Sequence, residues 1–263
     1  YLAGQSDRIT LNEYGETYEQ QPLINLVVSS PENHARMETL RERHLKLMDP
    51  GFAASEEGKK IIANDPAFTS FSYNIHGNEA SSTEAAMQVA YRLAAVKDAE
   101  TAQILKESVI ILFVCINPDG RDRYVYWING AGRQQPGINP NDFEHYAPWP
   151  NGRTNHYWFD LNRDWIWGVH PESRGLTDEY QRWMPQVHVD YHEQGYNSNY
   201  FTAPGATPRN LLLPDTYEAW SDTFGRANIA EFDREGLMYF TRDRFDFFYP
   251  GYGSSYPSVM GAI

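Results

Sequence analysis

Short apolar runs alternate with longer segments of helical periodicity along most of the chain. Short runs bounded by turn-forming residues are typical of strands, whereas apolar positions that recur every three or four residues are typical of amphipathic helices. An alternation of the two predicts an α/β fold. We therefore expect a mixed, mostly parallel twisted sheet with helices on both faces, a three-layer α/β/α architecture. The predicted strands are 22–30, 68–75, 108–117 and 186–193, and the predicted helices are 32–48, 81–96 and 216–236.

Three segments depart from this alternation. Segment 118–158 is rich in Asn, Gly, Pro and Tyr, and it predicts a long loop of the kind that is usually functional. Segment 249–257 is rich in Tyr, Gly and Pro, and the residues after it form an apolar run that predicts the start of a strand. We expect residues 1–263 to form a single domain that is incomplete at its C-terminus, since one core of this size suits the length.

Composition excludes several classes of protein. The 263 residues carry a formal net charge of -13, which argues against a nucleic-acid partner, because such binding relies on clustered Lys and Arg. No apolar run approaches the roughly 20 residues that a membrane-spanning helix needs. The single cysteine, Cys115, excludes a disulfide framework and a cysteine zinc site. The sequence shows no signal peptide at its start and gives no indication of oligomeric state.

Polar residues follow the apolar runs at three places along the chain. His76 and Glu79 follow the second predicted strand, the segment 117–119 (Asn-Pro-Asp) follows the third, and His192 follows Asp190 near the end of the fourth. In open α/β sheets the ligand crevice lies at the carboxyl ends of the strands. We therefore expect these three groups of side chains to converge on one site.

The pair His76 and Glu79 has the chemistry of a metal site. Neutral imidazole and carboxylate are good ligands for first-row metals, and Gly77 allows the backbone to turn between them. With His192 as a distant third ligand, the set predicts one catalytic Zn²⁺ with a coordination position left for water. The pair alone is more readily explained by a helix N-terminus with a capping carboxylate and an incidental histidine, so the other segments decide the interpretation.

Four motifs in a fixed order carry a family resemblance. The motifs HGNE, NPDG, DLNRDW and DYHEQG resemble those of the zinc metallocarboxypeptidases related to carboxypeptidase A, over about Leu23 to His192. The resemblance implies the carboxypeptidase fold and names His76, Glu79 and His192 as the zinc ligands. It also implies that Asn162 and Arg163 hold the C-terminal carboxylate of the substrate, and that Asp160 orients the first ligand histidine.

The resemblance assigns three further roles less directly. An arginine should polarise the scissile carbonyl, and Arg133 has about the right spacing, with Arg121 and Arg123 as competitors. A mobile tyrosine of the family corresponds to Tyr249 or Tyr252.

The general-base glutamate of the family has no counterpart in the chain. We expect it a few residues beyond Ile263. The chain's other candidate, Glu193, should point away from the ligands because neighbouring strand residues face opposite sides of a sheet. Asp190 should share the side of His192 and act as a buried acceptor. The glutamates of the last helix should be solvent-exposed: Glu218, Glu231 and Glu235.

The leading hypothesis is a zinc-dependent carboxypeptidase that hydrolyses the C-terminal peptide bond of peptides or proteins. A zinc amidohydrolase of the succinylglutamate desuccinylase and aspartoacylase type, acting on N-acyl amino acids, is an alternative, and so is a non-catalytic zinc-containing domain that binds peptides. The uncharged segment 251–260 favours neutral or aromatic side chains in the substrate. The resemblance further implies a secreted or periplasmic protein.

Overall fold

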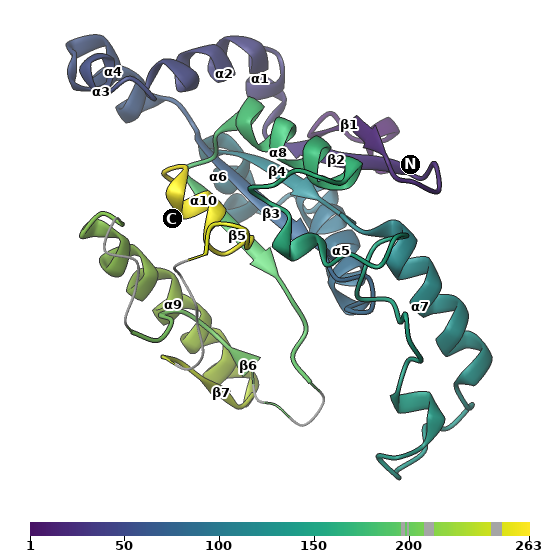
Figure 1. The fold of residues 1–263 in the computed structure, drawn as a ribbon. Coiled ribbons are helices and arrows are strands. Elements are labelled where there is room, and N and C mark those ends of the chain that lie inside the picture. The colour runs from purple at the N-terminus through teal and green to yellow at the C-terminus, as the bar shows by residue number, and fades with distance from the viewer. Residues whose placement is uncertain (196–197, 199, 208–212, 243–248) are drawn as a thin grey trace.

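The computed structural model describes residues 1–263 except 196–197, 199, 208–212 and 243–248. Figure 1 shows a central sheet between helices, with the small pair β6 and β7 beside the long helix α9. The described strands are β1 (Ile9–Glu16), β2 (Pro22–Val28), β3 (Ala67–Tyr73), β4 (Ser108–Phe113), β5 (Val187–Tyr191), β6 (Tyr200–Phe201) and β7 (Tyr239–Phe240).

Helices connect most of these strands. The α-helices are α1 (Pro31–His34), α2 (Met37–Lys46), α3 (Pro50–Ala54), α4 (Glu56–Asn64), α5 (Ser81–Ala95), α6 (Ala99–Glu107), α7 (Pro118–Ala131), α8 (Pro171–Trp183), α9 (Thr216–Glu235) and α10 (Tyr256–Val259). The 3₁₀ turns are η1 (Leu2–Gly4), η2 (Phe143–His145) and η3 (Leu161–Arg163). No described helix combines the length and the apolar character that crossing a bilayer requires.

The main sheet has the strand order β1-β2-β4-β3-β5. Strands β4, β3 and β5 run parallel to one another, while β2 is antiparallel to both β1 and β4. The predicted mixed α/β sheet is thus confirmed, with the parallel part in its last three strands. Because β3 and β5 are parallel neighbours, their carboxyl ends meet at one edge, and this brings the segments after Tyr73 and Tyr191 together.

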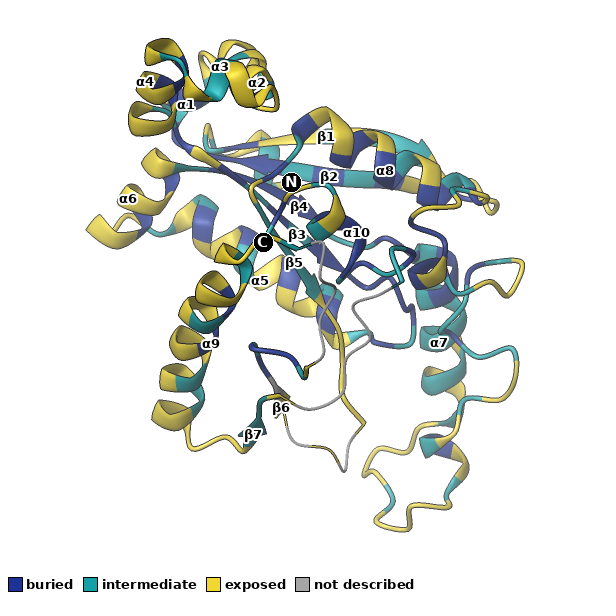
Figure 2. Ribbon diagram, turned by 60° about the vertical axis from the view of Figure 1, so that its left-hand side comes forward, coloured by how far each residue is buried: buried dark blue, intermediate teal, exposed yellow. Residues whose placement is uncertain are grey.

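Strand β4 shows why helices cover both faces of the sheet. Val109, Ile111 and Phe113 belong to one buried cluster with residues of α2 and α8, whereas Ile110 and Leu112 belong to another with residues of α5 and α6. Successive strand residues face opposite sides, so a strand buried on both faces is a continuous apolar run. Figure 2 shows the buried central strands between the partly exposed helices.

The predicted loop 118–158 is wrong over its first part, because α7 begins at Pro118. The Asn117 side chain accepts a hydrogen bond from Gly120 N and caps the helix, and proline is well suited to a first helical position. Strand β1 escaped prediction since most of its residues are polar and exposed or half-buried. The remaining predicted strands overlap β2, β3, β4 and β5, and the predicted helices overlap α2, α5 and α9.

The apolar run at the end of the chain is partly helical. Residues 256–259 form α10, so the predicted strand does not begin directly after Pro257. Ile263 pairs with the edge of the sheet, because its backbone N donates to Gln186 O at 3.0 Å and its backbone O accepts from His188 N at 2.9 Å. The strand-like pairing is therefore present, but only at this last residue.

Candidate active site

The turn between β3 and α5 carries the first two candidate ligands. Asn74 has a left-handed backbone, with φ of 58°, and its Nδ2 donates to the carbonyl oxygens of His76 and Glu79, each at 2.9 Å. An asparagine tolerates this conformation better than most residues and here bonds its own turn. The turn is thereby held rigidly at the carboxyl end of the sheet.

Glycine at position 77 is required by close packing rather than by the turn. A Cβ atom there would lie 2.2 Å from the backbone of Gly120 and 2.5 Å from the carbonyl oxygen of Gly152. A Cβ on Gly120 would likewise lie 2.5 Å from that same oxygen. Three glycines therefore allow the HGNE turn, the start of α7 and the segment around 152 to touch through their backbones.

The three predicted ligands meet at one point. His76 Nδ1 lies 2.8 Å from Glu79 Oε1, His192 Nδ1 lies 3.0 Å from Glu79 Oε2, and the two Nδ1 atoms are 3.2 Å apart. Ligand atoms bound tetrahedrally to zinc at about 2.0–2.1 Å are separated by about 3.3 Å. The donor types and their spacing therefore fit a zinc ion, and we call these three residues the primary cluster.

Each imidazole of the primary cluster contacts an aspartate carboxylate through its other ring nitrogen, Nε2. His76 Nε2 lies 3.0 Å from Asp160 Oδ1, and His192 Nε2 lies 2.7 Å from Asp190 Oδ2. Asp190 also accepts a hydrogen bond from Ser72 Oγ at 2.9 Å. A neutral imidazole that donates through Nε2 presents its lone pair at Nδ1, so both rings are set to bind a metal through Nδ1.

Electrostatic coupling inside the cluster shifts two pKa values strongly. Burial disfavours the charged form of Glu79, yet hydrogen bonds from His192 and His76 outweigh it and lower its pKa to about 2. Burial likewise opposes the charged form of His192, yet Asp190 and Glu79 raise its pKa to about 10. In the metal-free protein the two neighbouring carboxylates therefore favour the protonated form of His192.

Arg153 lies at the primary cluster and was missed by sequence reasoning. Its guanidinium lies 3.0 Å from Asp160 Oδ2 and 3.7 Å from Glu79 Oε1. Its backbone carbonyl accepts a hydrogen bond from Asn117 Nδ2, and Arg123 donates to the neighbouring carbonyls of Asn151 and Thr154. Arg123 therefore supports the segment that carries Arg153 instead of reaching the ligands.

The arginine assignment made from spacing is not supported by this arrangement. Arg133 follows the far end of α7, with a side chain 62% exposed and paired with Asp142 at 3.3 Å. A helix of this length places it roughly 20 Å along the axis from Asn117. Arg121 pairs with the exposed Glu84 on α5.

Asn162, which the resemblance assigns with Arg163 to the substrate's C-terminal carboxylate, contacts the primary cluster. Asn162 Nδ2 is 3.1 Å from His192 Nε2, and its Oδ1 accepts a hydrogen bond from Gly253 N. The Arg163 guanidinium is centred 4.3 Å from the Tyr252 ring, and its side chain is 47% exposed. Tyr249 Oη donates to Arg163 O at 3.2 Å, so both candidate tyrosines pack at this arginine.

Among the described glutamates, only Glu79 places its carboxylate in hydrogen-bond contact with the two imidazoles. Glu193 contacts Glu79 through its backbone N, while its own carboxylate accepts from Ser81 N at the start of α5. This matches the expectation that Glu193 points away from the ligands. The three glutamates of α9 are exposed, as predicted.

A model of the zinc carboxypeptidase family matches residues 2–200. The chain belongs to the zinc carboxypeptidase family. Membership supports a metal-dependent hydrolase, and it agrees with the donor set of the primary cluster. No curated protein matches the chain significantly.

Solved structures of metallocarboxypeptidases have the same fold as this chain. The metallo-carboxypeptidase of Burkholderia cenocepacia has a TM-score of 0.64 and 16% identity, with 100% of this chain and 56% of that chain covered. Carboxypeptidase A of Helicoverpa armigera has a TM-score of 0.62 and 17% identity, with coverage of 99% and 59%. The chain thus spans a little over half the length of these solved structures.

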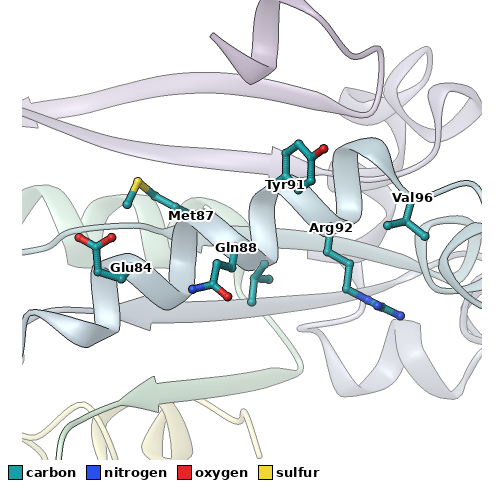
Figure 3. A pocket seen from close by; sticks show the side chains of 7 residues that line it. Glu84, Met87, Gln88, Tyr91, Arg92 and Val96 are labelled. Carbon is teal, nitrogen blue, oxygen red and sulfur yellow. The ribbon is translucent and has the colours of Figure 1, made fainter.

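A pocket on the outer side of α5 is separate from the primary cluster. Figure 3 shows its lining side chains along one helix, and none is a candidate ligand or a residue of the four motifs. It therefore carries no part of the candidate active site. The lining residues are Glu84, Met87, Gln88, Val89, Tyr91, Arg92 and Val96.

Proposed function

We propose that the protein is a zinc-dependent carboxypeptidase that hydrolyses the C-terminal peptide bond of peptides or proteins. The observation that carries this proposal is the position of Asn162, whose amide lies 3.1 Å from the ligand His192 while Arg163 follows it directly. A group bound by these two residues would lie next to a metal held by the primary cluster. That juxtaposition suits a substrate cleaved close to its terminal carboxylate.

The Arg163 side chain supplies recognition of that carboxylate. Its planar guanidinium offers paired donors that match the geometry of a carboxylate, and Tyr252 supports it on one face. The Tyr252 ring and the hydrogen bond from Arg163 Nη1 to Asn162 O at 2.8 Å fix the direction of the guanidinium, while Tyr249 Oη donates to the Arg163 backbone. The half-exposed side chain leaves its donors accessible to a ligand.

Zinc, when bound, would polarise a carbonyl and lower the pKa of a water molecule to about 7. In the proposed complex Arg153 binds the carbonyl oxygen of the scissile bond, and its position within 4 Å of both Asp160 and the ligand Glu79 supports this role. In the proposed complex it takes the role that spacing alone would give to Arg133. Asp160 then holds Arg153 and the ring of His76 together.

Recognition of the terminal carboxylate by Arg163 is tested by peptide binding to the zinc-loaded protein. We expect a peptide with a free C-terminus to bind roughly 10- to 100-fold more tightly than its C-terminal amide, since hydrogen bonds to charged groups contribute about 1.5–3 kcal/mol. Arg163→Ala should remove this preference, whereas the matched control Arg133→Ala should keep it. A preference that survives in Arg163→Ala would contradict recognition of the carboxylate by Arg163.

Product analysis separates the proposal from its alternatives. Stepwise release of single C-terminal residues, followed by mass spectrometry, is the expected result. Faster hydrolysis of an N-acyl amino acid than of a peptide would identify an amidohydrolase. Tight binding of free C-termini without any release would identify a zinc-containing peptide-binding domain. Secretion, which the resemblance implies, is tested by locating the protein in cell fractions.

A further inference from the structure

A second group of candidate ligands lies apart from the primary cluster. One carboxylate oxygen each from Glu19 and Asp119, and one ring nitrogen of His156, lie within 4.8 Å of one another. His156 Nδ1 is 2.8 Å from Glu19 Oε1, and both side chains are 42% exposed. We call these three residues the Glu19 cluster.

The Asp119 carboxylate is buried and only one of its oxygens is hydrogen-bonded. The residue is 1% exposed, and its Oδ1 accepts a hydrogen bond from Thr17 Oγ1 at 2.6 Å. Its Oδ2 is buried and has no hydrogen-bond partner. A buried carboxylate oxygen without a partner is costly, and a bound cation is one way in which proteins satisfy it.

The surroundings of Asp119 add negative charge without a matching arginine or lysine. Within the described part of the chain, no arginine or lysine forms an ion pair with Glu19, Asp119 or the buried Glu172. Burial raises the pKa of the Glu172 carboxyl, and the charge of Asp119 adds to that rise. Both Glu172 carboxylate oxygens also lack a hydrogen-bond partner. A divalent cation would balance the charges of Glu19 and Asp119.

We propose that the Glu19 cluster binds a second divalent transition-metal ion, with zinc as the ion of best fit. One imidazole and two carboxylates suit zinc, which takes three protein ligands and leaves a position for water. Calcium fits less well, because it requires six to eight oxygen ligands. This proposal does not rest on the proposed peptidase activity.

The ion would join three segments that are distant in sequence. Glu19 lies in the turn after β1, where Thr17 N donates to Gln21 O, and Asp119 lies in the first turn of α7. His156 lies three residues after Arg153, in the segment that continues to Asp160. A metal bound here would therefore fix the segment that presents Arg153 to the primary cluster.

The test is the zinc content of untagged protein after dialysis against metal-free buffer. We expect two zinc ions in the wild type and one in either His156→Ala or Glu19→Gln. Both of these side chains are half-exposed, so neither change should impair folding. His76→Ala should also retain one ion, and His145→Ala, a change of another loop histidine, should retain two. A wild type with one zinc, or two in both His156→Ala and Glu19→Gln, would overturn the proposal.

Hydrogen exchange locates the second ion without relying on activity. In His76→Ala, added zinc should slow the exchange of amides in 17–21 and 151–158 at least about threefold. In the double variant His76→Ala, His156→Ala it should have no such effect. Equal slowing in the two variants would show that zinc acts elsewhere. Failure of this test would leave the peptide-binding test of Arg163 unaffected, so the two proposals can fail separately.

Discussion

The primary cluster and the Glu19 cluster use similar donors but hold them differently. In the primary cluster, His76 is 3% exposed and both imidazoles are fixed through Nε2 by aspartates. In the Glu19 cluster, His156 is half-exposed and contacts Glu19 directly through Nδ1. Preorganised ligands lose less freedom on binding, so we expect the primary cluster to bind zinc more tightly.

The two clusters share one element of backbone support. The turn of the primary cluster is held by Asn74 and by the contact of Gly77 with Gly120 and Gly152. Gly120 directly follows Asp119, so the same backbone contact lies next to one ligand of the Glu19 cluster. Rigid backbone packing can therefore support both sites at once, whereas the side-chain anchors are particular to one.

The largest effect should come from removing a primary ligand. His76→Ala or His192→Ala should weaken zinc binding at that cluster by roughly 100-fold or more, because four-ligand sites bind with about 10–16 kcal/mol in total. His156→Ala should leave this affinity unchanged. Competition titration against a chelator of known affinity measures the difference. Equal losses in all three variants would mean that the clusters are not separate.

Gly77→Ala should damage both clusters by forcing the backbones apart. We expect a loss of about 3 kcal/mol in the free energy of unfolding, because the new methyl group meets backbone atoms that cannot give way. Gly130→Ala, on the open side of α7, is the matched control and should stabilise by about 0.5–1 kcal/mol. Denaturant titration of both variants checks this. A tolerated Gly77→Ala would argue against the three-glycine contact.

Replacing the aspartates that contact the two imidazole rings should have a smaller effect on zinc affinity. Asp160→Asn and Asp190→Asn should each lower zinc affinity at the primary cluster by roughly 10- to 100-fold, because an amide holds the imidazole less well than a carboxylate. Zinc binding at the Glu19 cluster should be unaffected. The same chelator competition provides the measurement. Unchanged affinity in both variants would show that these aspartates do not contribute to zinc binding.

Zinc binding at the primary cluster should release about one proton at pH 7. The pKa of His192 in the metal-free protein is about 10, so the ring must lose its proton before Nδ1 can bind. The His192 ion pairs stabilise the metal-free protein fully below its ordinary pKa of 6.5, and this contribution is lost as pH rises through about 10. Calorimetric titration in two buffers of different ionisation enthalpy counts the proton. Identical enthalpies would contradict a charged His192.

Sequence reasoning identified the parts of the site that local motifs determine. His76, Glu79 and His192 follow β3 and β5, and the parallel pairing of these strands is what brings them together. The role of Arg153 could not be predicted from the sequence, because Asn117 and Arg123 position its segment through hydrogen bonds that span 28 to 36 residues. The Glu19 cluster joins residues 137 apart, and no motif links them. Long-range packing fixes both arrangements.

The most direct test of the central claim is an anomalous diffraction measurement at the zinc edge on crystals of the protein. We predict a strong peak about 2.0–2.2 Å from His76 Nδ1, a Glu79 carboxylate oxygen and His192 Nδ1. Crystals of His192→Ala grown with the same zinc should show that peak weakened or lost. A fully occupied zinc elsewhere, with no peak between these three side chains, would contradict the account.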